Sequence, residues 1–505
     1  MIAPEQPRRR RYQFRLRTLL IVMALLVLPF AWVGSKLRQA QRQQDAIDWV
    51  ELHAGSVRFE DAPSGNWWEE KTRAWFGTPV VDVFLENAVL SDLTPLSGLQ
   101  ELQSLALIES HVPDLSPLAR LKKLEKLYLR DTNASDLTPL EGLKGLRRVH
   151  LSDTLVSDLS PLAGLTSLRG LNLADSQVTD LTPLSAVHSL EWIHLGRTQV
   201  SDLSPLAAMK SLEDIHLEGT QVRDITPLAK LHDLENLSLD DTQVDDLKPL
   251  AQLKRLKYLW LEGTEVSLLT PLAGLKNLEI LTLDETKVQD LMALSQLSNL
   301  ERLSLDDTHV RDVAPLVGLK QLRSLSLERT KVRDLTPLAQ LASLETLALQ
   351  DTQVSDLTPL ASLKRLEDLY LDGTRVTDLA PLIGLKSLRL LHLKGTGIAN
   401  LDQVAKLEGL ERLSLNDTQV ADLSLLTELK NLGGLSLQGT RVTDAKPLAA
   451  LQDLKFLSLG NTQITDLEPL AELKNLLRLD LRGNEVSDEQ LQMLQDALPD
   501  CDIVR

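Results

Sequence analysis

From residue 81 onward, hydrophobic residues return at the same positions every 22 residues. In the unit from Leu121 to Leu143, leucines stand at positions 121, 124, 127, 129, 137 and 140. Leu127 and Leu129 alternate with polar residues, which predicts a short strand with both leucines on one face. The other leucines are expected to fill the same interior from the opposite side. Because one unit cannot bury its own apolar face, the units are expected to stack.

A proline marks a second fixed position of the repeat. It recurs every 22 residues from Pro95 to Pro469, and only Ala293, Gln403 and Leu425 depart from the series. The pair Thr138-Pro139 is typical of a helix start, with Thr as the cap and Pro at the first position. A short helical turn is therefore predicted on the side opposite the strand.

A hydroxyl recurs after each predicted strand. The column runs from Thr132 to Thr462, with Ser110 and Ser176 as variants and Asn484 at its end. A hydroxyl offers one donor and two acceptor lone pairs, so it can hydrogen-bond the turning backbone. We interpret these residues as structural, because no base stands beside each of them to make a nucleophile.

An aspartate stands two residues before each Ser/Thr-Pro pair. The column runs from Asp92 to Asp488 and is broken only by Leu268 and Asn400. Its carboxylate can accept backbone N–H groups in the turn. Stacked carboxylates could also bind calcium, but the spacing lacks the Gly-rich turns of calcium-binding β-rolls. We therefore predict a structural role.

The L-x-x-L-x-L pattern with its 22-residue period resembles the bacterial leucine-rich-repeat class typified by internalins, although internalins usually carry Asn where this chain has Thr. The resemblance implies an α/β solenoid, a leucine-rich-repeat horseshoe with about 18 repeats of 22 residues. A parallel β-sheet is expected on the concave face, and short helical or 3-10 turns on the convex face. The resemblance also implies protein–protein recognition.

The N-terminal segment differs from the repeats. Arg8 to Arg11, Arg15 and Arg17 precede an uncharged run, Thr18 to Gly34, whose length is at the lower limit for a membrane-spanning helix. No A-x-A-like cleavage site follows the run, which favours an uncleaved signal anchor over a cleaved signal. The excess of Arg before the run predicts a cytoplasmic N-terminus and an extracytoplasmic repeat domain in a single-pass protein of the cytoplasmic membrane.

These patterns divide the chain into five segments. A helix is predicted from Ser35 to Ala54, ending at Gly55, and an aromatic stretch that includes Trp67 and Trp68 is interpreted as a small cap. The segments are a basic cytoplasmic tail (1–17), a transmembrane signal anchor (18–34), a helix and N-terminal cap (35–80), the solenoid (81–484) and a C-terminal cap (485–505).

Composition excludes several functions. The net charge of −17 combines +7 over residues 1–45 with −24 over the rest, and so acidic a body argues against nucleic acid as the main partner. The single cysteine, Cys501, rules out a disulfide framework and a Cys-based zinc site. Phosphate-binding, metalloprotease and nucleophile-elbow motifs are missing from the sequence, so we predict no catalysis and no cofactor.

Aromatic residues point to a candidate binding surface. Aromatic residues make up only 3% of the chain, and from Phe84 onward they occur only at the outward positions of the predicted strands. One interpretation is purely structural: strands favour aromatic residues, and the inward-facing positions are too tightly packed to hold them. Exposed aromatic and His clusters are also typical of recognition surfaces. The predicted ligand-binding residues are Tyr128, His150, Trp192, His194, His216, Tyr258 and Trp260, with Glu218 and Glu262 along the edge.

Two further features border this surface. A column of residues before the Thr turn is acidic from Glu218 to Asp372, except at Gln350. It is either a solvated rim or a negative stripe for a basic partner. His194 and His216 are expected on adjacent strands, where a metal would need a third ligand such as Asp214. The spacing alone does not show that these side chains converge, so the sequence predicts no metal.

The leading hypothesis is a membrane-anchored leucine-rich-repeat protein that recognises a protein or peptide through its concave face, with a glycan as the alternative ligand. One rival is a structural, self-associating protein of the cell envelope. Another is the regulatory subunit of an enzyme, against which the predicted anchor argues.

Overall fold

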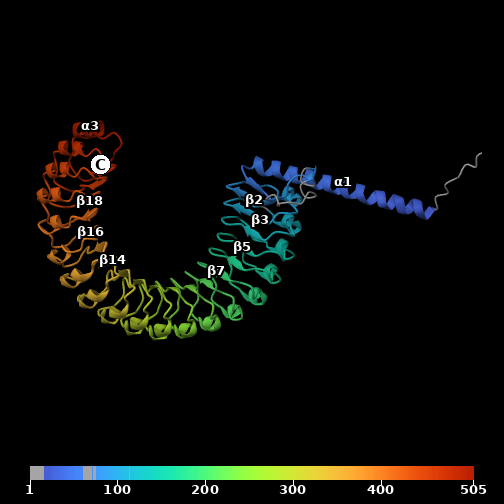
Figure 1. Cartoon of the computed structure of the whole chain (residues 1–505), viewed down its shortest axis with the longest axis horizontal. Coiled ribbons are helices and arrows are strands. Elements are labelled where there is room, and N and C mark those ends of the chain that lie inside the picture. Colours follow the sequence, from blue (N-terminus) through green and yellow to red (C-terminus); the bar gives the residue numbers. More distant parts are fainter. Residues whose placement is uncertain (1–15, 61–70, 72–74, 113) are drawn as a thin grey trace, which may run out of the picture. The chain divides into compact units, whose positions relative to one another are not determined.

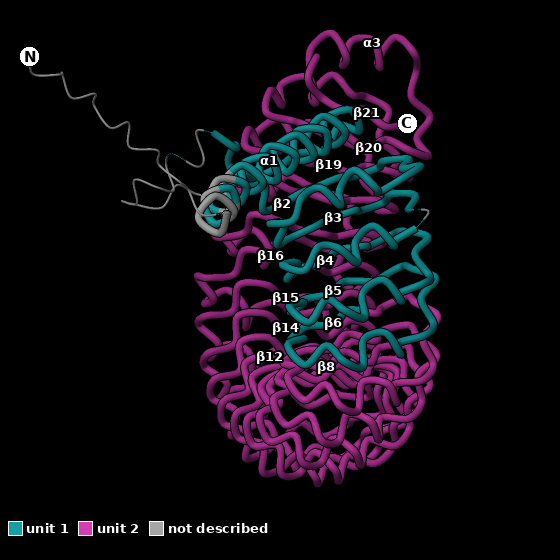
Figure 2. The backbone as a smooth tube through the Cα atoms, turned by 90° about the vertical axis from the view of Figure 1, so that its right-hand side faces the viewer, with its two compact units in different colours: residues 1–172 teal, residues 173–505 magenta. Residues whose placement is uncertain are grey.

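A computed structural model describes residues 16–60, 71, 75–112 and 114–505. It divides into two compact units, residues 1–172 and residues 173–505, shown in two colours in Figure 2. The predicted basic tail falls almost wholly outside the described residues, and so do Trp67 and Trp68 of the predicted aromatic cap. Each unit is described by itself below.

Unit 1 begins with one continuous helix, α1 (Leu16–Leu52), where the sequence predicted a span ending at Gly34 and a second helix after it. Ala46, Ile47 and Val50 near its C-terminal end are buried against the first repeat. The helix ends at Leu52, and the chain turns away from it at Ala54, which adopts a left-handed φ of 58° and is followed by Gly55. Gly55 is required there because a Cβ would lie 2.5 Å from Leu85 Cδ2.

The predicted membrane span lies within α1, and the side chains of residues 18–20, 22, 24, 26 and 29 are outside the described part of the chain. Among the residues that are described, no helix is both long enough and apolar enough to cross a membrane. The described large apolar side chains of this segment, from Ile21 to Val33, are exposed to solvent.

The strands of unit 1 begin with an antiparallel pair, β1 (Ser56–Phe59) and β2 (Val80–Glu86). From β2 onward each strand pairs in parallel with the next. These strands are β3 (Ser104–Ile108), β4 (Lys126–Tyr128), β5 (Arg148–His150) and β6 (Gly170–Asn172). The intervening 3-10 turns are η1 (Thr94–Gly98), η2 (Ser116–Arg120), η3 (Thr138–Leu140) and η4 (Ser160–Leu162).

Unit 2 continues the same repeat, and each of its strands pairs in parallel with its neighbour in sequence. Its strands line the inner side of the unit's arc in Figure 1, and its 3-10 turns line the outer side. The strands are β7 (Trp192–His194), β8 (Asp214–His216), β9 (Asn236–Ser238), β10 (Tyr258–Trp260), β11 (Ile280–Thr282), β12 (Arg302–Ser304), β13 (Ser324–Ser326), β14 (Thr346–Ala348), β15 (Asp368–Tyr370), β16 (Leu390–His392), β17 (Arg412–Ser414), β18 (Gly434–Ser436), β19 (Phe456–Ser458), β20 (Arg478–Asp480) and β21 (Asp502–Val504).

The turns of unit 2 are η5 (Thr182–Ala186), η6 (Ser204–Leu206), η7 (Thr226–Lys230), η8 (Lys248–Gln252), η9 (Thr270–Gly274), η10 (Met292–Gln296), η11 (Ala314–Gly318), η12 (Thr336–Gln340), η13 (Thr358–Ser362), η14 (Ala380–Leu382), η15 (Val404–Lys406), η16 (Ser424–Glu428), η17 (Lys446–Ala450) and η18 (Glu468–Glu472). The final helix, α3 (Asp488–Ala497), is capped by Ser487, whose hydroxyl accepts a hydrogen bond from Gln490 N, and it packs against η18. Parallel strands alternating with 3-10 turns confirm the predicted fold class.

Stacked leucines form the core of each unit. In one repeat of unit 2, Leu281 of β11 and Leu283, just after the strand, project inward, and Leu291 and Leu294 close the same layer from the turn. All four are almost completely shielded from water. Burying each side chain contributes roughly 2 kcal/mol, so only the shared core of many repeats offsets the entropy of ordering the backbone.

The aspartate column begins the 3-10 turns, and this corrects the predicted role of threonine. Asp136 Oδ1 accepts a hydrogen bond from Thr138 N at 2.8 Å, while Thr138 is itself the first residue of η3 and makes no capping bond. The same bond recurs in unit 2, for example from Thr336 N to Asp334 Oδ1 at 2.8 Å. Hydrogen bonds from the side chain of Thr336, and then from its backbone N–H, hold the pKa of Asp334 below its usual value. The carboxylate caps because it lies two residues before the first free N–H.

The threonine column bonds the backbone as predicted. Thr286 is buried, and its Oγ1 donates to the carbonyl oxygen of Leu283 at 2.6 Å. Glu285, just before it, adopts a left-handed φ of 57°, which turns the chain out of the strand. Asn484 at the end of the column bridges two repeats, because its Nδ2 donates to both Leu459 O and Leu481 O. A threonine therefore secures its own turn, whereas the asparagine also links it to the preceding repeat.

We predict that Thr286→Val lowers the free energy of unfolding by about 1 kcal/mol, the usual net contribution of one hydrogen bond. Leu283 O keeps the backbone N–H of Thr286 as a second donor at 3.3 Å, so the loss stays modest. Thr282→Val is the matched control, because Thr282 Oγ1 is shielded and finds no hydrogen-bond partner in the described chain. Denaturant titration measures both, and equal effects of the two substitutions would contradict the role of the column.

Candidate recognition surface on the solvent face of the sheet

Residues on the solvent face of the sheet fall into three columns, because parallel strands in register place equivalent residues side by side. The first column is level with Trp192 and includes Asp214, which pairs with it across β7 and β8. The second column is level with His194 and includes His216. The third column follows two residues after the second, beginning with Gly196 and Glu218 in unit 2.

The structure brings the predicted residues together in two groups. Tyr128 and His150 lie on neighbouring strands of unit 1, where their rings stack with centroids 4.7 Å apart and planes inclined by 26°. The other predicted residues all belong to unit 2, so this second group is described separately.

The second group forms a continuous chain of rings on β7, β8 and β10. The ring centroids of Trp192 and His194 are 5.1 Å apart, and those of His194 and His216 are 4.3 Å apart. His216 and Trp260 lie on either side of β9, where the intervening residue is the small Ser238, and their ring centroids are 6.1 Å apart. The ring centroids of Tyr258 and Trp260 are 6.0 Å apart. All five rings are half-buried rather than sealed in the core.

Charged groups surround His216 on both sides. Its Nε2 lies 3.0 Å from Asp214 Oδ1, and its Nδ1 lies 3.7 Å from Glu218 Oε2. His194 Nε2 lies 3.7 Å from the same oxygen of Asp214. Asn236 Nδ2 donates to the other oxygen of Asp214 at 3.2 Å and so orients that carboxylate. Asp214, which the sequence offered only as a third ligand for a metal, is thus part of this cluster, and so is Asn236, which the sequence did not single out.

The contacts shift the titration of the cluster. Close contact with the carboxylate of Asp214, and then with that of Glu218, raises the pKa of His216 to about 9, against the opposing effect of burial. Burial alone would raise the pKa of Asp214, but contacts with His194, His216 and Asn236 hold it far below its usual value. His216 therefore carries a proton at neutral pH. Its stabilising contribution is complete below pH 6.5 and is lost as the pH rises through about 9.

Glu218 lies over a glycine of the preceding repeat. A Cβ at Gly196 would lie 2.0 Å from Glu218 Oε1, so only glycine leaves room for this side chain. Burial would raise the pKa of Glu218, but the contact with His216 lowers it overall. Glu262, the other predicted edge residue, is exposed and projects from the third column two repeats further on.

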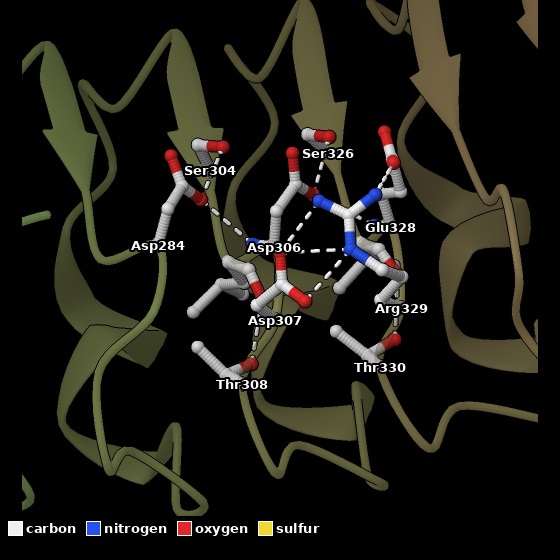
Figure 3. Close-up of polar contacts among 11 residues, drawn as sticks. Asp284, Ser304, Asp306, Asp307, Thr308, Ser326, Glu328, Arg329 and Thr330 are labelled. Carbon is white, nitrogen blue, oxygen red and sulfur yellow. Dashed lines mark hydrogen bonds and ion pairs between the residues drawn. The ribbon is translucent and has the colours of Figure 1, made fainter. Parts of the chain in front are cut away.

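The third column has a structural role that the sequence did not reveal. Asp284 Oδ1 accepts hydrogen bonds from Ser304 Oγ at 2.6 Å and from Asp306 N at 2.7 Å, both in the next repeat (Figure 3). Asp306 repeats this arrangement with Ser326 Oγ and with the backbone of Glu328. The acidic side chains therefore link successive repeats, which corrects the expectation of a solvated rim without a role in the fold.

Burial and stacking make these carboxylates unusual acids. Burial raises the pKa of Asp240 and of Asp284 to about 6, in spite of the hydrogen bonds that each accepts. Neighbouring carboxylates of the same column add to the effect, as Glu262 does for Asp240. Beside the column, Arg329 donates to Asp307 at 2.6 Å and also contacts Glu328, which partly neutralises this stretch (Figure 3).

A hollow lies on the solvent face of the sheet near the C-terminal end of unit 2. Gly434 has no side chain, so a gap opens between Arg412 and Phe456, its neighbours in the first column. His392 and Arg478 complete the walls of this hollow. Phe456 is 54% exposed and stacks on no other ring in the described chain, unlike the rings around His216.

Sequence comparison agrees with the fold. The family described as "Leucine Rich repeats (2 copies)" matches residues 144–186, 430–472 and 452–496. No curated protein sequence matches this chain significantly. The chain has the leucine-rich-repeat fold, and its solved structural neighbours include internalins.

Three solved structures illustrate this similarity. An internalin from Listeria monocytogenes shares 27% identity, with 63% of this chain and 88% of that chain covered and a TM-score of 0.53. A leucine-rich-repeat protein from Leptospira interrogans shares 23% identity, covering 78% of this chain and 99% of the other, with a TM-score of 0.62. The plant peptide hormone receptor RGFR1 in complex with RGF2 shares 16% identity, covering 85% and 81%, with a TM-score of 0.57.

We predict that Asp284→Asn stabilises the protein at pH 7.5 by about 1 kcal/mol, a value reduced for solvent screening. The amide oxygen keeps both hydrogen bonds and removes the charge. Because the pKa of Asp284 is raised to about 6 in the folded state, the stability of the wild type is fullest below pH 3.8 and declines as the pH rises through 6. Urea titration from pH 4 to 7.5 should show the advantage of the variant only at the upper end.

The control for this prediction is Asp334→Asn. Asp334 caps η12, and its pKa is lowered by hydrogen bonds from Thr336, so the substitution should destabilise the protein at pH 7.5. If both substitutions change the free energy of unfolding in the same direction, the negative charge of Asp284 does not destabilise the fold.

Proposed function

We propose that this protein is a non-catalytic recognition module that binds a protein or peptide through the solvent face of the sheet in unit 2. The observation that carries the proposal is the half-buried chain of rings from Trp192 to Trp260, bordered by Glu218 and Asp240. Tyr128 and His150 provide a smaller surface of the same kind in unit 1.

The fold does not need these rings. The inward positions of the same strands, such as Ile193 and Leu259, already fill the core, and the solvent face accepts small residues such as Ser238 and Ser304. Large rings that stay half-exposed provide apolar area for a partner at little cost in side-chain entropy. Rings and charges at neighbouring positions are typical of the central part of an interface.

The charge of the surface favours a basic ligand. The third column places Glu218, Asp240, Glu262 and Asp284 on successive repeats beside the rings. Such a row attracts Lys and Arg, which would also relieve the repulsion that adds to burial in raising the pKa of Asp240. The favoured ligand is therefore a peptide or protein segment with basic and aromatic side chains. The same acidic row argues against nucleic acid, and a glycan remains the alternative that rings can also bind.

The rival functions make distinct predictions. A structural envelope protein would use this surface to bind its own copies, whereas a recognition module would be monomeric without its ligand. Light scattering of the full-length protein separates the two. A regulatory subunit would instead bind a folded enzyme, and its interface would be of a standard protein–protein size rather than a peptide-sized patch.

We also infer that residues 18–34 attach the protein to the cytoplasmic membrane with the repeats outside. Ile21, Leu25, Leu28 and Phe30 of α1 are each more than half exposed, an arrangement that water disfavours in an isolated soluble helix. The arginines before this segment support a cytoplasmic N-terminus.

We predict that Trp192→Ala combined with Trp260→Ala weakens peptide binding at least tenfold and leaves the melting temperature within a few degrees of wild type. Truncating an aromatic anchor costs about 2 kcal/mol in binding, and these side chains lie outside the leucine core. The probe is a peptide enriched from a random display library on the full-length protein. Affinity is measured by calorimetry and stability by thermal melting.

The matched control is Lys144→Ala with Lys254→Ala, two residues outside the strands. This pair should leave the affinity of the peptide unchanged. A tryptophan variant that binds the peptide as tightly as wild type would contradict the proposed surface, and one that unfolds would show that the rings are packing residues.

For the anchor, we predict that a reporter fused after Arg505 is active only outside the cytoplasm and that the protein resists extraction from membranes by carbonate. The control replaces Leu25 and Leu28 with Arg, which should release the protein from the membrane fraction. Cytoplasmic reporter activity in the unaltered protein would contradict the orientation, and a mature chain beginning near Gly34 would contradict the anchor.

A further inference from the structure

Two imidazoles and one carboxylate converge on a single point of the solvent face. One atom of each of His194, Asp214 and His216 can be chosen so that all three lie within 4.8 Å of one another. Asp214 Oδ1 lies between the two imidazoles, 3.0 Å from His216 Nε2 and 3.7 Å from His194 Nε2. The side chains come from adjacent strands in register, so the sheet itself holds them in place.

We propose that His194, Asp214 and His216 form a binding site for a divalent transition metal, with zinc as the metal that the donors fit best. Two imidazoles with one carboxylate are a common zinc-binding set that leaves a fourth position open. This proposal goes beyond recognition of a peptide and does not depend on it.

The distances suit zinc closely. Metal–ligand bonds of about 2.0–2.1 Å in a tetrahedron place the ligand atoms roughly 3.3 Å apart. The two distances to Asp214 Oδ1, 3.0 and 3.7 Å, lie on either side of that separation. The ligand nitrogens of the two imidazoles lie within 4.8 Å of each other. Rotation of these half-buried side chains, each 31% exposed, can bring the nitrogens to the separation that a tetrahedral site requires.

The surroundings complete the arrangement expected around a metal. A metal-bound imidazole usually directs its other ring nitrogen toward a carboxylate, and a metal-bound carboxylate is itself hydrogen-bonded. Glu218 Oε2 faces His216 Nδ1 at 3.7 Å, and Asn236 Nδ2 donates to the second oxygen of Asp214 at 3.2 Å. Glu218 and Asn236 would therefore orient two of the three ligands.

Two carboxylate oxygens of the cluster, shielded from water, also favour a cation at this point. Asp214 Oδ1 and Glu218 Oε2 are removed from water, yet within the described chain neither has a donor aligned for a hydrogen bond. A divalent cation bound by the two imidazoles would lie against these oxygens. Because a metal binds only the neutral imidazole, protons and metal compete for the site.

The flanking residues place the open coordination position toward solvent. Trp192 lies 5.1 Å from His194 and Trp260 lies 6.1 Å from His216, while the leucine core blocks the opposite side. A bound metal would thus present its fourth position between two tryptophans, where water or a carboxylate or imidazole from a partner could occupy it.

The test is titration of the full-length protein, in mild detergent, with zinc alone against a chromophoric chelator. We expect one zinc ion per chain with micromolar or tighter affinity, at least tenfold weaker binding by His194→Ala and by Asp214→Asn, and weaker binding at pH 6 than at pH 8 because protons compete. Cobalt in place of zinc should give the intense visible absorption of a four-coordinate site. Calcium, which prefers oxygen ligands, should not compete.

His392→Ala is the matched control, because His392 also lies 3.7 Å from a carboxylate, that of Asp372, but has no second His beside it. It should bind zinc as wild type does. Thermal melting in chelator separates folding from binding: without metal, His194→Ala and His392→Ala should melt like wild type, whereas Asp214→Asn should melt somewhat lower because it loses the charge beside His216. Should His194→Ala fold normally and bind zinc as tightly as the unaltered protein, or should wild type bind no tighter than millimolar, the proposal is overturned.

Discussion

The structure depends on one constraint: no repeat can bury its own leucines, so each must be sealed by its neighbours. This explains why the spacing never slips. Leu281, Leu283 and Leu294 meet their counterparts in adjacent repeats only if every turn advances the chain by the same amount. An insertion of one residue would move a strand's inward face outward. The turns are equally restricted, since the carboxylate of Asp334 and the hydroxyl of Thr286 each satisfy a fixed backbone group.

The same constraint determines what the sequence could predict. Residues that face the core or close a turn are specified by chemistry that recurs in every repeat, so the strands, the turns and the role of Thr286 could be read from one unit. The backbone N–H of Thr336 is bonded by Asp334, two residues earlier, as the aspartate column predicted, and not by a threonine cap as the Thr-Pro pair predicted. Both columns recur with the same period, so periodicity alone does not decide between them.

The solvent face could be predicted only in part. Register alone places His194 beside His216, and this adjacency followed from the 22-residue period. It does not show that Asp214, one column away, reaches back between the two rings, because that depends on side-chain rotamers. Nor does it show that Asp284 bonds the next repeat, since an acidic residue at an edge has the same pattern whether it is solvated or bonded. Positions that recur in every repeat can be predicted from the sequence, whereas side chains that converge on one point cannot.

Stacking in register places equivalent residues of successive repeats side by side, so residues of like charge repel each other. The two parts of the solvent face differ in how they meet this repulsion. Along the third column, carboxylates lie on successive repeats, and burial together with their mutual repulsion raises the pKa of acids such as Asp284 to about 6. Around His216, different residues interleave: Asp214 lies between two imidazoles, and Glu218 occupies the space over Gly196. There the charges attract rather than repel. A solenoid builds a specific site where the outward positions of its repeats stop being identical, as they do between Trp192 and Trp260.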